Sequence, residues 1–384
     1  MRQDAASSTS TEAFVTQLER ARAAGVLRFD LTEADPARCG IGWDAGELEM
    51  LLETARGLPI SSYHAALAVA REAVASYLAG HGVAAHPDRI FFAPSRAAAR
   101  RRALDAVCRS GDDVLVPAPG RPLLDAERGI RSLRQRAYAV EFEGRWRLDR
   151  RSLRNALGPR AQAIVVGNPA EPSGATLAHD ELAFLEELCG ARDVALVGDE
   201  AYLDLALGPA FSVGRAKGCL ALHVSGLTGV CGLPRLGAEW IAVTGPDALA
   251  APVASGLGAG AELPRPVEEE ALRAIPALLA RREPFLARVR ARLARNRGLV
   301  ASAALREAPW SLQWGAGPWA VLQINPFRDA TALCLALLDA GVAVQPGALD
   351  GLPGGHLVVS LLPDPATFQA GLDRLEAQLR SAAP

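Results

Sequence analysis

The chain has 384 residues and is nearly neutral, with 41 Lys and Arg against 43 Asp and Glu. Nucleic acids and anionic membranes both favour a basic excess, so neither is expected as the main partner. The length suits two domains or one large α/β body. No apolar run is long enough to cross a membrane and no signal segment opens the chain, so we expect a cytoplasmic protein. Lys217 is the only lysine, and the other 40 of the 41 basic residues are arginine.

Short apolar runs of strand type alternate with helical patterns through the middle of the chain. This alternation is typical of a parallel sheet flanked by helices. Seven strands are predicted, at 89–93, 114–117, 136–141, 163–167, 194–198, 219–225 and 240–244. Helices are predicted near 65–78, 96–108, 150–156 and 179–189. Together they predict a large α/β domain over residues 45–265.

The last third of the chain has a different pattern. Residues 266–300 form a long Arg-rich helical stretch that Pro276 and Pro284 interrupt. A strand at 319–324, a helix at 330–341, a strand at 356–361 and a final helix from 366 follow. Residues 266–384 are therefore predicted to form a connecting helix and a small α+β domain, with the N-terminal segment 1–44 packed against it.

The six cysteines have no C-x-x-C pair and no histidine at metal-ligand spacing. Several lie inside apolar runs, where a free cysteine behaves as a small hydrophobic residue. We expect reduced core thiols and no metal, and we expect Cys231 to be one of those thiols. His223, inside a predicted strand, is expected in the core, and Asp204 on the surface.

Candidate functional residues lie in the turns after the predicted strands, where ligands bind to a parallel sheet. These turns read A-P-S-R (93–96), P-A-P-G-R-P (117–122), G-N-P-A-E-P-S-G (167–174) and G-D-E-A-Y (198–202), and a longer segment covers 225–240. Taken singly, each turn also has a structural explanation, because proline, glycine and asparagine form turns and Asp199 can cap a helix. Their order and spacing carry the functional argument.

The ordered set resembles the class I/II aminotransferases, which are fold type I enzymes dependent on pyridoxal phosphate (PLP). N-P-A-E-P-S-G is similar to N-P-x-N-P-T-G, and D-E-A-Y is similar to D-E-x-Y. L-T-E-A-D-P-A-R-C-G (31–40) is similar to L-T-E-S-N-P-T-R-x-G of one branch, and 344–347 and 356–362 are like the family's small-domain strands. The resemblance implies an α/β fold with a seven-stranded, mostly parallel sheet, a second, smaller α+β domain, and a dimer with active sites at its interface.

The family's lysine has no counterpart in the corresponding segment. A PLP enzyme holds its cofactor as a Schiff base on lysine, in a segment like S-x-L-[ST]-K-V-x-G-L-P-x-L-[RK]-x-G-W. Laid without gaps over 225–240, this segment places Gly229 at the lysine and Gly237 at the cationic phosphate contact. A two-residue gap would make Arg235 the phosphate arginine. Lys217 precedes the strand and is expected near the opposite edge of the sheet.

Other cofactor contacts implied by the resemblance are also replaced. Glu171 stands where an asparagine would bond the phenolic oxygen, and Arg121 stands where an aromatic residue would stack on the ring. Ser95, followed by Arg96, is what is left of the phosphate-binding helix start, and Val358 aligns with the substrate arginine. Asp199 keeps the position of the carboxylate that pairs with the pyridine nitrogen, and Tyr202 that of the phenol near the ring oxygen. The residues of this altered cleft are Ser95, Arg96, Arg121, Asn168, Asp199, Tyr202 and Arg235.

These replacements predict an aminotransferase-like protein that works without a PLP Schiff base, and no cofactor is expected. In the leading hypothesis the cleft binds or transforms a small anionic, amino-acid-like metabolite held by arginine, with Glu171 or Asp199 as general base and Tyr202 as acid. A first alternative is that Arg121 and Glu171 pair with each other or with Asp199, which would leave a non-catalytic protein, as a homodimer or as the partner of an active paralogue. A second alternative keeps PLP or pyridoxamine phosphate non-covalently.

Overall fold

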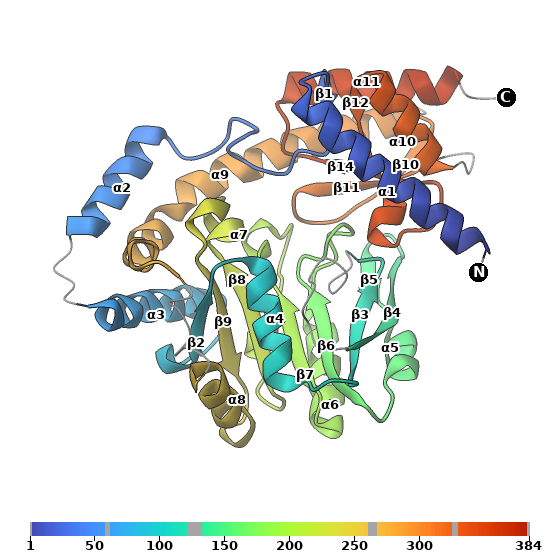
Figure 1. Cartoon of the computed structure of the whole chain (residues 1–384). Coiled ribbons are helices and arrows are strands. Elements are labelled where there is room, and N and C mark those ends of the chain that lie inside the picture. Colours follow the sequence, from blue (N-terminus) through green and yellow to red (C-terminus); the bar gives the residue numbers. More distant parts are fainter. Residues whose placement is uncertain are drawn as a thin grey trace.

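The computed structural model describes residues 2–57, 62–120, 133–259, 267–306, 308–324 and 329–381. A large sheet with helices on both faces forms one part, and a smaller sheet with its own helices forms the other (Figure 1). Both termini lie beside the small sheet (Figure 1). Within the described residues no helix is long and apolar enough to cross a membrane.

The large sheet has eight strands in the order β2-β9-β8-β7-β6-β3-β4-β5. Their bounds are β2 Ile90–Ala93, β3 Asp113–Ala118, β4 Arg134–Phe142, β5 Trp146–Leu148, β6 Ala161–Gly167, β7 Ala195–Asp199, β8 Ala221–Gly226 and β9 Glu239–Thr244. The pairs β4-β3, β3-β6, β6-β7 and β7-β8 are parallel, and β9 runs antiparallel to both of its neighbours. All seven predicted strands are present. The eighth, β5, is a three-residue antiparallel edge strand too short to be recognised in the sequence.

Alternate side chains of the central strands enter two separate cores. Ala163 and Val165 of β6 pack on one face with α4 (Arg96–Val107) and α8 (Asp247–Ala259). Ile164 and Val166 pack on the other face with α6 (His179–Arg192) and α5 (Arg150–Ala156). A strand covered on both faces must be apolar at every position, and this explains the uninterrupted A-I-V-V run.

The small part has a four-stranded sheet in the order β10-β11-β14-β13. Its elements are β10 Trp310–Gln313, β11 Trp319–Ile324, α10 Ala330–Asp339, β12 Val342–Ala343, β13 Gln345–Pro346, β14 His356–Ser360 and α11 Pro365–Ser381. The N-terminal segment reaches it through α1 (Arg2–Ala23), which packs on α10, and through β1 (Phe29–Asp30), which pairs in parallel with β12. One apolar core, from Phe14 to Leu379, joins these elements.

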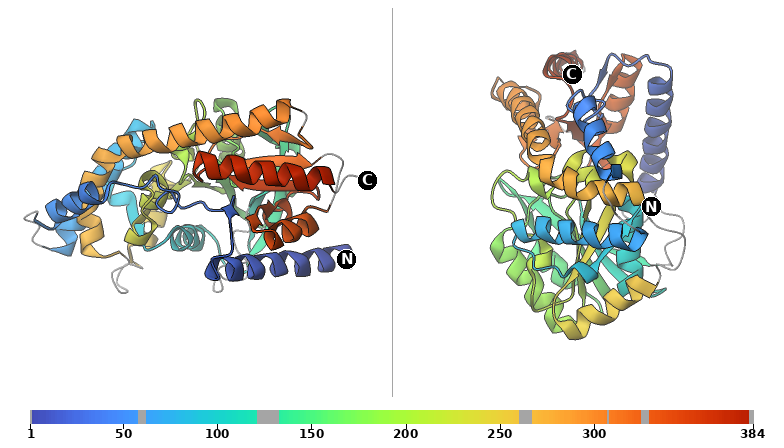
Figure 2. Two further views of the ribbon diagram at one scale, coloured as in Figure 1. Left: turned by 90° about the horizontal axis from the view of Figure 1, so that it is seen from above. Right: turned by 90° about the vertical axis from the view of Figure 1, so that its left-hand side faces the viewer.

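A 37-residue helix, α9 (Glu269–Leu305), connects the two parts and runs along the length of the molecule (Figure 2). The predicted interruptions at Pro276 and Pro284 are wrong, because α9 continues through both. Each proline costs a helix interior about 3 kcal/mol. This cost is offset because α9 buries one side against α3 (Tyr63–Gly80), α2 (Ala45–Gly57) and α7 (Leu227–Cys231), with Leu272, Ile275 and Phe285 in the interface.

A second connection between the two parts is a close backbone contact. The Ala316 N–H donates to the Gly174 carbonyl at 2.9 Å, which ties the turn after β6 to the small part. A Cβ on Gly174 would lie 2.3 Å from the Ala316 oxygen, and one on Gly315 would lie 1.9 Å from the Ser173 oxygen. Gly174 also has a φ of +69°, which L residues rarely adopt. Both positions therefore need glycine.

We predict that Gly174→Ala lowers the free energy of unfolding by more than about 1 kcal/mol, because both φ and the close contact resist a side chain. The matched control is Gly298→Ala on the exposed side of α9, where a Cβ meets nothing within 4 Å. That change should stabilise the protein by about 0.5–1 kcal/mol. Urea denaturation of both variants measures the difference. Equal effects would mean that the Gly174 contact is not tight.

Candidate functional site

The carboxyl ends of the parallel strands gather the turns singled out in the sequence. Asp199 ends β7, and Tyr202 follows it at the start of a 3-10 helix, Leu203–Leu205. Glu171 lies in the turn after β6, and Arg96 opens α4, which follows β2. Gly229 lies in α7, directly after β8. The topology therefore brings these five residues to one edge of the sheet.

Arg96 links the two carboxylates of this edge. Its Nε donates to Asp199 Oδ1 at 2.8 Å and to Oδ2 at 3.1 Å, and its Nη1 donates to Glu171 Oε1 at 2.7 Å. Arg100, one helical turn further along α4, donates to Asp199 Oδ2 at 3.0 Å. The Arg96 guanidinium carbon lies 5.1 Å from the centre of the Tyr202 ring. We call Arg96, Arg100, Glu171 and Asp199 the arginine cluster.

The arginine cluster is largely removed from solvent. The side chains of Arg96, Glu171 and Asp199 are 18%, 9% and 6% exposed. Burial raises the pKa of the Asp199 carboxyl, but Arg96 and Arg100 outweigh it, and the pKa lies below its ordinary value. Burial likewise lowers the pKa of the Arg96 guanidinium, but Asp199 and Glu171 raise it well above the ordinary value. The charged forms therefore stabilise one another, as a buried ion pair requires.

A third carboxyl, Glu239, lies at this edge and was not predicted from the sequence. Its Oε1 accepts hydrogen bonds from the backbone N–H of Thr228 at 3.1 Å and from the Thr228 hydroxyl at 2.5 Å. Its Oε2 is buried and has no hydrogen-bond partner among the described residues. Burial raises its pKa despite the Thr228 hydrogen bonds. A glutamate inside the apolar run E-W-I-A-V-T is the signal that could have identified it.

Three other predicted site residues, Ser95, Asn168 and Arg235, form no hydrogen bond with the arginine cluster. Ser95 Oγ accepts from the Ala98 N–H at 3.1 Å and caps α4. The Asn168 amide donates to Glu200 at 2.7 Å and to the Phe211 carbonyl at 3.1 Å, so it holds structure instead of facing the cleft. Arg235 is exposed on a 3-10 helix, Pro234–Leu236, and makes no ion pair with the described residues. Arg121 lies outside the described residues.

Two further predictions concern buried groups beside the site. His223 is buried in β8 as predicted, where Nδ1 contacts the Glu200 carboxylate. The prediction of a surface Asp204 is wrong. Its carboxylate is 9% exposed, accepts from the Tyr77 hydroxyl at 3.0 Å and lies 3.1 Å from His81 Nε2. Both partners come from α3, which the local sequence around Asp204 does not reveal. The cysteines are free thiols, and all but Cys39 are buried, as expected.

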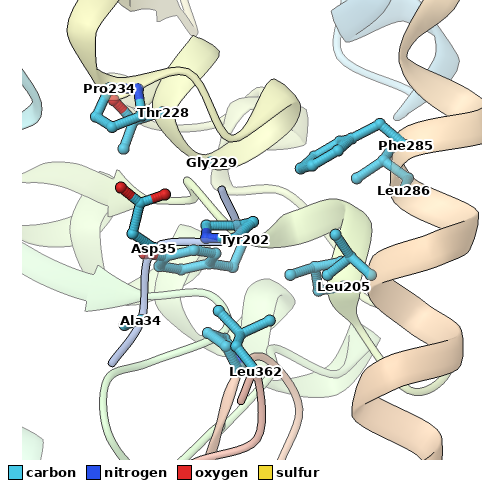
Figure 3. A pocket seen from close by; sticks show the side chains of 13 residues that line it. Ala34, Asp35, Tyr202, Leu205, Thr228, Gly229, Pro234, Phe285, Leu286 and Leu362 are labelled. Atoms are coloured by element: carbon cyan, nitrogen blue, oxygen red, sulfur yellow. The ribbon is translucent and has the colours of Figure 1, made fainter. Parts of the chain in front are cut away.

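A cavity of about 160 Å³ lies next to Gly229, between the two parts of the molecule (Figure 3). Its walls come from the N-terminal segment, the turns after β7 and β8, α9 and the small part. The lining residues are Ala34, Asp35, Pro36, Tyr202, Leu205, Thr228, Gly229, Pro234, Phe285, Leu286, Val289, Pro318 and Leu362. Most of this lining is apolar.

The chain matches the model of a known family. Residues 52–375 fit the model of the family "Aminotransferase class I and II". This chain belongs to the class I and II aminotransferase family. The match covers both parts of the structure, so the fold predicted from the resemblance is confirmed.

Individual relatives in the family are distant. An alanine aminotransferase of Mycobacterium tuberculosis is 28% identical over 158 residues, which is 40% of this chain and 37% of that one. Glutamate-pyruvate aminotransferase AlaA of Escherichia coli is 27% identical over 181 residues, 46% of this chain and 44% of that one. The chain thus matches less than half the length of these curated relatives. Alanine aminotransferase from Pyrococcus furiosus superposes with a TM-score of 0.87 at 20% identity, covering 97% of both chains.

Membership of the aminotransferase family makes PLP the cofactor to test against these residues. The resemblance aligns Gly229 with the Schiff-base lysine, and a Cβ on Gly229 would lie 1.8 Å from the Ala201 carbonyl oxygen. No side chain, lysine included, fits there without a backbone shift. Lys217 is exposed and precedes β8, at the opposite end of the strands from the site. Asp199 and Glu171, which the resemblance aligns with the contacts to the pyridine nitrogen and the phenolic oxygen, are both bonded to Arg96. These residues do not fit a PLP Schiff base.

We predict that Arg96→Met lowers the free energy of unfolding by about 3 kcal/mol, because it removes one partner of a buried ion pair. Arg150→Met is the control, since Arg150 and Asp180 form an ion pair that is 42% and 66% exposed. That change should cost less than about 1 kcal/mol. Denaturation at neutral pH compares the two. A similar small loss in both variants would mean that the arginine cluster is not a buried ion pair.

Glu239→Gln should stabilise the protein at neutral and higher pH. The raised pKa of Glu239 means that the folded state favours the protonated carboxyl. Glu239 therefore contributes to the free energy of unfolding at low pH, and this contribution is lost as pH rises through the folded pKa. Glutamine keeps an acceptor for Thr228 and removes the titration. Melting temperatures at several pH values should differ most at high pH and converge at low pH. The exposed Glu187→Gln should show no such trend.

Proposed function

We propose that this chain is an aminotransferase-family protein that works without a PLP Schiff base, with the Arg96 guanidinium in place of the cofactor ring. One observation carries the proposal: Arg96 bonds Asp199 and Glu171 together and lies against Tyr202. A planar guanidinium has several N–H donors and can satisfy both carboxylates at once. Gly229, with no room for a side chain, supports the same conclusion.

The arginine cluster has little positive charge left for an anionic metabolite. Arg96 and Arg100 already bond Asp199, and Arg96 also bonds Glu171. An incoming anion would have to compete with carboxylates that burial makes hard to displace. This argues against the anionic ligand predicted from the sequence and against Glu171 or Asp199 as a general base, since neither is a base while it is held by arginine. Ligand binding is instead assigned to the cavity beside Gly229.

Under this proposal the protein is a ligand-binding relative of the aminotransferases and not a transaminase. Its residues bind and position a ligand, and no proton transfer is assigned to them. Homodimerisation and pairing with an active paralogue stay predictions.

We predict that the purified protein binds neither PLP nor pyridoxamine phosphate. Each compound is added in excess and removed by gel filtration. Absorbance between about 320 and 430 nm is then read before and after borohydride, and calorimetry is run alongside. AlaA of Escherichia coli serves as the positive control. No retained chromophore is expected, because Arg96 takes the space and the partners of the ring.

A stoichiometric chromophore would overturn the proposal. Reduction by borohydride followed by mass spectrometry would separate the two ways in which this could happen. A reduced adduct must lie on Lys217 or the N-terminal amine, the only aliphatic amines of the sequence. A chromophore without an adduct would establish non-covalent binding.

A further inference from the structure

The cavity beside Gly229 has the size of a small organic ligand. Its volume of about 160 Å³ is close to that of a cavity of about 150 Å³ known to hold one benzene molecule. Phe285, Leu286 and Val289 of α9 form one wall, and Leu205 and Leu362 extend it. These walls favour a compact apolar body, because its transfer from water is favourable and the walls offer it no competing polar group.

Among the described residues that line the cavity, Asp35 is the only one with a formal charge. In Figure 3 its carboxylate lies on the side of the cavity away from Phe285 and Leu286. Oδ1 accepts a hydrogen bond from the Ala37 N–H at 2.9 Å, and no arginine among the described residues pairs with this carboxylate. The lining therefore has one negative end and one apolar end.

The remaining polar groups of the lining do not supply a cation. The Thr228 hydroxyl donates to Glu239 and is thereby engaged. Tyr202 offers its ring, which lies in a T-shaped contact 5.1 Å from Trp319. No arginine is among the described lining residues, and Arg96, which lies against Tyr202, is bonded to Asp199 and Glu171. A ligand carboxylate would thus meet Asp35 and apolar walls without a partner.

The geometry points to a binding site for a small primary amine with an apolar body of about benzene size and no carboxylate. Its ammonium group pairs with Asp35, and its body lies against Phe285, Leu286 and Val289. This inference rests on the proposed function, because a cofactor Schiff base at position 229 would fill the same space. It also reverses the ligand charge predicted from the sequence, from an anion to a cation.

Three probes of one shape test the inference on the full chain without added PLP. Benzylamine carries the ammonium group, benzyl alcohol lacks the charge, and phenylglycine adds a carboxylate to the amine. Isothermal titration calorimetry at pH 7 should show benzylamine binding at least tenfold more tightly than either of the others. Equal binding of benzylamine and benzyl alcohol, or tighter binding of phenylglycine, would overturn the inference.

Asp35→Asn removes the charge while keeping the shape of the side chain and the acceptor for Ala37. It should weaken benzylamine binding at least tenfold and leave benzyl alcohol binding unchanged. Asp44→Asn, an exposed change at the start of α2, is the matched control and should alter neither. An Asp35→Asn variant that binds benzylamine like the unchanged protein would overturn the assignment of Asp35.

The two proposals fail in distinguishable ways. If PLP binds while benzylamine still binds the cofactor-free protein through Asp35, the proposed function fails and the amine site stands. If PLP does not bind and benzylamine shows no preference over benzyl alcohol, the amine site fails and the Arg96 proposal stands.

Discussion

The structure at the carboxyl ends of β6 and β7 depends on one requirement, that buried carboxylates have partners. Asp199 and Glu171 are removed from water by the fold, and an isolated buried charge is strongly unfavourable. Arg96 and Arg100 meet this requirement from a single helix, because residues four apart lie on the same face. Because α4 starts at the edge of the sheet where β7 ends, its first two turns place Arg96 and Arg100 beside Asp199.

Consecutive residues at the end of β7 solve the same problem on opposite faces of the sheet. Asp199 is neutralised by α4, whereas Glu200 turns to the other side and contacts His223 and Ser212. Burial raises the pKa of Glu200, but His223 outweighs it and the pKa lies below its ordinary value. The D-E pair is thus accounted for by two independent buried contacts, an ion pair between Asp199 and arginine and a contact between Glu200 and His223. Only Asp199 belongs to the arginine cluster.

The sequence predicts what depends on local pattern and misses what depends on distant partners. The strands and helices of the large sheet follow from apolar runs and from turn residues beside them, and all seven predicted strands are found. The closeness of Glu171 and Asp199, the partners of Arg96, can be predicted from the sequence, because they lie at the ends of the neighbouring strands β6 and β7. Asp204 is not, since its burial depends on Tyr77 and His81 of another helix. Glu239 was not predicted, although a glutamate at the start of the apolar strand β9 marks it in the sequence.

Arginines also connect separate segments of the chain in α9. Arg292 donates through Nη1 to the carbonyls of Cys39 at 3.2 Å and Leu362 at 2.8 Å, and so joins the N-terminal segment to the small part. Arg297 donates to the carbonyls of Gly315 and Gly317, both at 3.2 Å. A guanidinium has a fixed fork of donors and bridges two carbonyls without losing its charge. The same fork of donors lets Arg292 bond the carbonyl of Leu362 in the cavity wall and lets Arg96 bond two carboxylates. In this protein arginine therefore connects both the walls of the cavity and the buried carboxylates at the edge of the large sheet.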